Sequence, residues 1–130
     1  MRFPLAASLA SSLVLLLAAC AVPPDKPIGL TEVAERPAEK ALLAGIRAYD
    51  DGQYIESEKQ FKMALGAGLA SAKDRAAANK HLAFIYCTSN RQPDCEAAFR
   101  AARQADPSFA LSKSEAGHPV WGPVYKRVQP

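Results

Sequence analysis

Cysteine is the residue type in this chain with the widest choice of chemistry. Cys87 and Cys95 flank a polar segment, TSNRQPD, so seven residues separate them. Such a pair can form a disulfide, supply half of a zinc site or act as a redox couple. A redox centre usually has the closer CxxC spacing. A zinc site needs two more ligands, for which the chain has only the histidines His81 and His118. The compartment decides between these chemistries.

Other reactive groups give no sign of catalysis. The motifs GxSxG and HExxH and a glycine-rich phosphate loop do not occur. The carboxylate pairs Asp50/Asp51 and Glu56/Glu58 fall in an expected turn and on an expected wet helix face, where charged side chains are ordinarily solvated. We therefore expect that the chain is no enzyme and has no catalytic residue, no cofactor and no metal site.

The beginning of the chain indicates the compartment. Arg2 precedes an uncharged apolar run over residues 5–19, which is the layout of a bacterial secretory signal peptide. The run is shorter than the about 20 residues of a membrane-spanning helix, and an uncleaved membrane anchor is the alternative. A secreted chain enters an oxidising compartment, where a pair of cysteines predicts a disulfide.

The end of the apolar run is more specific. Residues 17–20 read Leu-Ala-Ala-Cys, which resembles the lipobox of bacterial lipoproteins. The resemblance implies a lipoprotein signal peptide over residues 1–19 and acyl chains on Cys20, which would fasten the chain to a membrane. Ala21, where an aspartate would retain the protein in the inner membrane, favours the outer membrane and a periplasmic location.

The rest of the chain is short and nearly balanced in charge. Without residues 1–19 it has 111 residues, with 15 Lys and Arg against 13 Asp and Glu. No basic block supports a nucleic-acid partner, and the length predicts one domain. We interpret residues 20–37 as the acylated cysteine and a proline-rich tether that spans up to about 50 Å. The alternative is that Ile28, Leu30 and Val33 pack onto the domain.

The middle of the chain predicts an all-α fold. Helical spacing of apolar residues, together with turn and cap residues, places four helices, over 38–49, 54–67, 71–88 and 93–105. Ser71 is the expected cap of the third helix, with Asp74 in its first turn. The four helices form two antiparallel hairpins. Cys87 and Cys95 then lie at the same turn, where a disulfide would contribute about 2–3 kcal/mol.

The two hairpins resemble a repeat. Both copies are similar to the tetratricopeptide pattern, the first through Gly45, Gly52, Tyr54, Phe61, Ala64 and Leu65, the second through Leu82, Ala83, Tyr86, Cys95, Phe99, Ala102 and Pro107. The resemblance implies two such repeats over residues 38–107. The chain departs from the pattern because 38 residues separate Phe61 from Phe99, against a usual repeat of about 34. Ser57 also replaces a small alanine, and Leu69 a proline.

Residues 108–130 hold too many large apolar side chains for a free tail. Two repeats leave open apolar ends that need a cap. We therefore expect the tail to fold back over the third and fourth helices, with Pro123 at the start of a short turn. Alternatively, Trp121 and Tyr125 stay partly exposed as anchors for a partner, and both interpretations can hold together.

Taken together, the motifs at both ends of the chain and the two repeats resemble a more specific family. The lipobox, the two repeats, residues 81–87 with Cys95, and residues 117–123 together look like the small tetratricopeptide lipoproteins of bacterial type VI secretion systems. That resemblance implies an accessory role beside an envelope machine and no catalytic residues. We expect the chain to bind an envelope protein through its inner helix faces, with Tyr49, Tyr54, Trp121 and Tyr125 as aromatic anchors.

Two other functions remain open from the sequence. One is a pilotin-like chaperone that escorts an outer-membrane channel subunit. The other belongs to a different class, a periplasmic thiol oxidoreductase that uses Cys87 and Cys95.

Overall fold

The structure is a computed structural model that describes residues 27–130. The predicted signal peptide, Cys20 and the first part of the tether lie outside the described residues. The described part has seven helices and no strand, and none of these helices is long and apolar enough to cross a membrane. The helices are α1 Leu30–Ala34, α2 Pro37–Asp50, α3 Tyr54–Ala67, α4 Ala72–Thr88, α5 Gln92–Ala105, α6 Lys113–Ala116 and α7 Gly122–Arg127.

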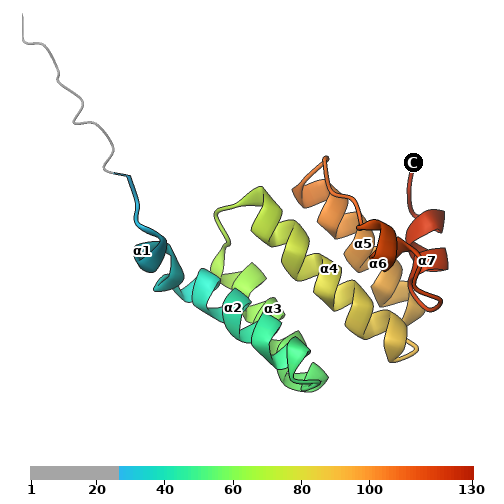
Figure 1. Cartoon of the computed structure of the whole chain (residues 1–130), viewed down its shortest axis with the longest axis horizontal. Coiled ribbons are helices and arrows are strands. Elements are labelled where there is room, and N and C mark those ends of the chain that lie inside the picture. The colour runs from blue at the N-terminus through green and yellow to red at the C-terminus, as the bar shows by residue number, and fades with distance from the viewer. Residues whose placement is uncertain (1–26) are drawn as a thin grey trace, which may run out of the picture.

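Two antiparallel hairpins form the body of the domain (Figure 1). α2 packs on α3, α4 packs on α5, and α4 also contacts both helices of the first hairpin. The predicted all-α fold of two helical hairpins is therefore confirmed. Each of the four predicted helices agrees with the structure to within one residue at either end.

Local sequence explains where these helices begin and end. Pro37 and Pro93 stand in the first turns of α2 and α5, where the missing N–H of proline loses no helical hydrogen bond. The side chain of Ser71 accepts a hydrogen bond from the backbone N–H of Asp74, as the sequence predicts. Gly68 ends α3 with a φ of 87°, which residues with a Cβ rarely adopt.

The first hairpin closes tightly because one position has no side chain. A Cβ at Gly45 of α2 would lie 2.8 Å from the ring of Phe61 on α3. The hydroxyl of Ser57 donates a hydrogen bond of 2.8 Å to the carbonyl oxygen of Gly45, and both Ser57 and Phe61 are fully buried. The serine that departs from the repeat pattern thus fills the crossing with its one polar group satisfied.

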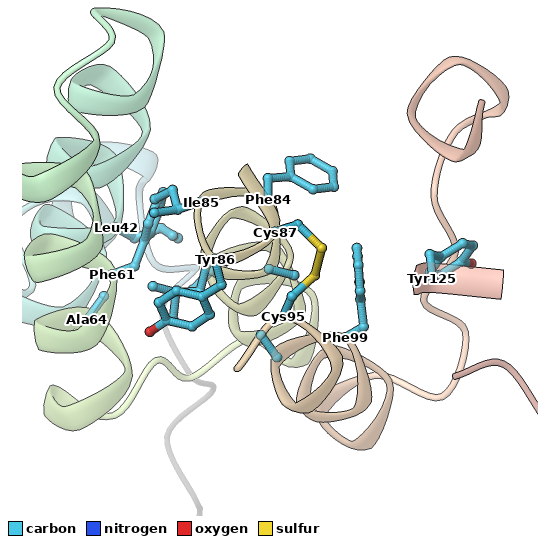
Figure 2. Packing of buried hydrophobic residues seen from close by; sticks show 14 of the residues in the cluster. Leu42, Phe61, Ala64, Phe84, Ile85, Tyr86, Cys87, Cys95, Phe99 and Tyr125 are labelled. Atoms are coloured by element: carbon cyan, nitrogen blue, oxygen red, sulfur yellow. A yellow bond between two sulfur atoms is a disulfide. The ribbon is translucent and has the colours of Figure 1, made fainter. Parts of the chain in front are cut away.

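The core is built around the second half of α4. Residues 82–87 are all buried, so this part of the helix has neighbours on every side. Ile85 is directed toward Leu42 of the first hairpin, and Cys87 is directed toward Cys95 of α5 (Figure 2). α4 is the element that joins the two hairpins into one core.

The C-terminal tail covers α4 and α5, which confirms the predicted cap. Trp121 stacks on Phe84 of α4 with ring centroids 4.2 Å apart. The ring of Tyr125 lies 5.3 Å from that of Phe99, and its hydroxyl accepts a hydrogen bond from the backbone N–H of Leu111. The predicted short turn after residue 122 is the helix α7.

Two short helices differ from the sequence expectation. α1 lies inside the expected tether, and α6 is held by a capping box in which Ser112 and Glu115 exchange hydrogen bonds. A helix of one turn is too short to show a periodic pattern of apolar residues. Leu30 is 89% exposed and Ile28 is exposed too. Of the three apolar residues proposed to pack onto the domain, only Val33 is half-buried.

Gly45→Ala is expected to destabilise the domain by about 1–3 kcal/mol, because the added methyl group overlaps the ring of Phe61 in a packed core. Gly66→Ala is the matched control. Its Cβ would meet no atom within 4 Å, so its unfolding free energy should rise by up to about 1 kcal/mol through helix propensity. Urea unfolding followed by circular dichroism measures both. Equal stability of the two variants would contradict the tight crossing.

Candidate functional site

The cysteine pair forms the covalent link of the second hairpin. Cys87 stands near the end of α4 and Cys95 in the first half of α5, and a disulfide bond joins them. Both residues are buried, Cys95 completely. The bridge lies among core side chains between the two helices (Figure 2). Because thiol exchange needs an accessible sulfur, this environment suits a structural bridge.

Aromatic rings form a continuous row from the first turn to the tail. Six rings belong to this aromatic row, in contact order Tyr54, Tyr49, His81, Phe84, Trp121 and His118. The ring centroids of successive members are 3.3–6.1 Å apart. The row runs from the end of α2 and the start of α3 across α4 to the segment before α7, so it joins both hairpins and the tail.

The predicted anchor residues divide into two groups. Tyr54 is 51% exposed, and Tyr49 and Trp121 are half-buried. The structure brings Tyr49 and Tyr54 into edge contact at 5.4 Å, while Trp121 lies at the far part of the row. Tyr125 does not belong with them: it is 5% exposed and packed on Phe99. Its expected role as an accessible anchor is therefore corrected to that of a core residue.

His81 is the junction of the aromatic row. Its ring stacks on Phe61 at 5.1 Å and meets Tyr49 edge-on at 5.1 Å. Its Nδ1 lies 2.8 Å from the carbonyl oxygen of Ala77, so the neutral tautomer with the proton on Nδ1 makes this bond. Burial lowers the pKa of His81, although the bond to Ala77 opposes the shift. The folded domain therefore favours a neutral imidazole among the rings.

Charged groups beside the row are paired with each other. The Lys80 ammonium on α4 lies 2.7 Å from the Glu115 carboxylate on α6, which ties the tail to α4. Burial alone would raise the pKa of Glu115, but hydrogen bonds from Lys80 and Ser112 lower it below its ordinary value. Burial raises the pKa of the Tyr49 hydroxyl above its ordinary value, so the folded domain disfavours its ionisation further. The Lys80–Glu115 pair therefore helps to hold the tail, which carries Trp121, against α4.

Sequence reasoning missed three members of the row: His118, Phe84 and His81. The ring of His118 stacks on that of Trp121 with centroids 3.3 Å apart, and the ring of Phe84 also stacks on Trp121. The signal for the first was the His-Pro-x-Trp spacing at residues 118–121, which puts both rings on one turn. Among residues 27–130, no group of three or more His, Cys, Asp or Glu side chains is placed to hold a metal ion.

Comparison with known proteins adds no relative. No family model matches the chain, and no curated protein or solved structure gives a significant match.

Replacing both cysteines, as Cys87→Ala/Cys95→Ala, should lower the unfolding free energy by about 2–3 kcal/mol, because the unfolded chain regains the entropy of an open loop. Urea unfolding of the oxidised protein and the variant measures the difference. A reducing agent should move the wild-type midpoint toward that of the variant and leave the variant unchanged. A wild-type midpoint that ignores complete reduction would contradict a stabilising bridge.

The stability of the domain should fall as pH drops below about 6.5, the ordinary pKa of histidine. The folded state lowers the pKa of His81, so the unfolded state takes up its proton first and is favoured by acid. Urea unfolding at pH 7.5 and pH 5.5 measures the loss. His81→Gln, which keeps a donor for Ala77 but does not titrate, should be less stable at pH 7.5 and show a smaller pH difference. An unchanged pH difference in this variant would assign the effect elsewhere.

Proposed function

We propose that this chain is an outer-membrane lipoprotein whose helical domain binds another envelope protein in the periplasm, as an accessory of a type VI secretion machine. The anchor is supported by the lipobox at residues 17–20 and by the apolar run before it. A buried disulfide fits this location, because such bridges persist in oxidising compartments. The tetratricopeptide-like reading of residues 38–107 belongs to the same proposal.

The aromatic row is the observation that carries the binding role. Tyr54, Tyr49 and Trp121 present partly exposed rings that are held by other rings and by the disulfide-closed hairpin. The indole N–H of Trp121 also donates a bond of 2.8 Å to the carbonyl oxygen of Glu115. Tyrosine and tryptophan dominate the energetics of protein interfaces, and rings already fixed in place lose little entropy on binding.

The same geometry argues for binding over thiol chemistry. A thiol oxidoreductase must expose one sulfur to its substrate, whereas the two sulfurs here are enclosed by α4, α5 and core side chains. The assignment to a type VI machine is supported by the sequence resemblance at residues 81–95 and 117–123.

The anchor is tested with Cys20→Ser in a Gram-negative host. Wild-type chain should incorporate labelled palmitate and sediment with outer membranes, because two or more acyl chains hold a protein firmly. Cys20→Ser should lose both properties. The disulfide should be present in the wild type, as trapping of free thiols with a maleimide reports. Unaltered labelling and sedimentation of the variant would refute the anchor.

The binding surface is tested by site-specific photo-crosslinking in the same cells. A benzophenone residue at Tyr54, or at Val120 beside Trp121, should cross-link to one envelope protein, while one at exposed Gln104 on α5 should not. Trp121→Ala should reduce the yield from position 54, because the proposed interface includes the exposed rings at both ends of the row. Mass spectrometry identifies the partner. Absence of an adduct at both sites, or an equal adduct at Gln104, would refute the surface; a partner outside secretion machines would refute the assignment to one.

A further inference from the structure

The outward face of α3 carries two large apolar side chains that the rest of residues 27–130 leaves half or more exposed. Ile55 is 90% exposed and Met63 is 52% exposed. The side chain of Lys59, midway between them, is exposed as well. These three residues, together with Glu58 and Lys62, line a shallow groove on the surface. We call Ile55, Lys59 and Met63 the α3 ridge.

The α3 ridge faces away from the rest of the domain. The buried residues of α3 are Ser57, Phe61 and Ala64, which pack toward the other helices. Lys59 precedes Phe61 by two residues, which is about 200° around an α-helix. Residues spaced by four form one of the rows that interdigitate when two helices cross. The ridge therefore has the form of a helix-packing surface that nothing in residues 27–130 covers.

We propose that a second copy of this chain packs on the α3 ridge, with the two α3 helices antiparallel and crossing at Lys59. A two-fold axis there pairs each residue with the one equally far on the other side of position 59. Ile55 then meets Met63 of the second copy, and Met63 meets the second copy's Ile55. The four most exposed apolar side chains of the two ridges are thereby buried together.

The charges beside the ridge obey the same symmetry. Glu56 and Lys62 stand three residues before and after Lys59, so each faces the opposite charge of the second copy. Their side chains are 45% and 55% exposed, respectively. The Lys62 ammonium also bonds the carboxylate of its own Glu58, so in the dimer it is shared between Glu58 and the second copy's Glu56. Glu56 also lies 3.6 Å from its own Lys59. Opposite charges therefore meet at both flanks of the crossing, which is the self-complementarity that a symmetric dimer requires.

The crossing itself limits the affinity. Two Lys59 side chains approach each other there, and each relies on its Glu56 to balance the charge. One pair of short helices also buries less than the about 1,200–2,000 Å² of stable interfaces. We therefore expect a weak dimer, seen at high protein concentration. The dimer uses neither the aromatic row nor Cys20, so its tests are independent of the tests of the proposed function.

Cross-linking tests the antiparallel register. All variants of the full chain carry Cys20→Ser, are purified in mild detergent and are treated with a short bismaleimide. Lys59→Cys should form a covalent dimer. Ile55→Cys alone should not, because the two positions lie about 12 Å apart along the helix axes, yet mixing it with Met63→Cys should link the two chains. Gln104→Cys on α5 is the control. Strong self-linking of Ile55→Cys, or no dimer of Lys59→Cys at millimolar protein, would overturn the proposal.

Charge exchange distinguishes a second copy from another protein. In sedimentation equilibrium, Glu56→Lys should weaken the dimer at least about tenfold, since both flanks then hold like charges. The double variant Glu56→Lys/Lys62→Glu should recover part of the lost affinity. The charges across the dimer are exchanged and again opposite, while each chain loses its own Lys59–Glu56 and Lys62–Glu58 pairs. Lys59→Ala should strengthen it by removing the central repulsion. A double variant as weak as the single one, or a weaker Lys59→Ala, would overturn the symmetric pairing.

Discussion

The burial of the second half of α4 is the constraint on which the fold depends. Six successive side chains, residues 82–87, point in all directions around the helix, so no single neighbour can cover them. The first hairpin covers one side, α5 a second, and the tail the remainder. A domain this small buries little apolar surface, so each of these neighbours matters for stability. The Cys87–Cys95 bridge keeps α5 in place against α4. The two hairpins are therefore parts of one cooperative unit.

Most of the architecture could be predicted from local signals. The proline starts, the Ser71 cap and the spacing of apolar residues located the four long helices, and their antiparallel order brought Cys87 to Cys95. The short helices α1 and α6 were not predicted because a helix of one turn is too short to show a periodic pattern of apolar residues. The Ser-x-x-Glu sequence at the start of α6 was nevertheless a usable signal. Tyr125 was misplaced because burial of a tail residue depends on tertiary contacts, here with Phe99 and Leu111.

The candidate site was only partly visible in the sequence. Tyr49 and Tyr54 are neighbours across a short turn, so their contact follows from the hairpin. The place of His81 between them and Phe84 depends on how the hairpins pack, which no local pattern reports. The packing also explains how a protein of this size can hold partly exposed rings in fixed positions. Tyr54 rests on Tyr49 and Tyr49 on His81, while Trp121 rests on Phe84, a buried core residue.

The tail completes the core with residues that are synthesised after the four long helices. Trp121 covers Phe84, and Tyr125 covers Phe99, yet both residues follow all four long helices in the sequence. During synthesis or transport from the N-terminus, the apolar surface of α4 and α5 stays uncovered until these residues arrive. A copy that stops early keeps that surface open to chaperones and proteases, which recognise such patches. Synthesis of residues 121–125 is thus the step after which the apolar surface of α4 and α5 is covered.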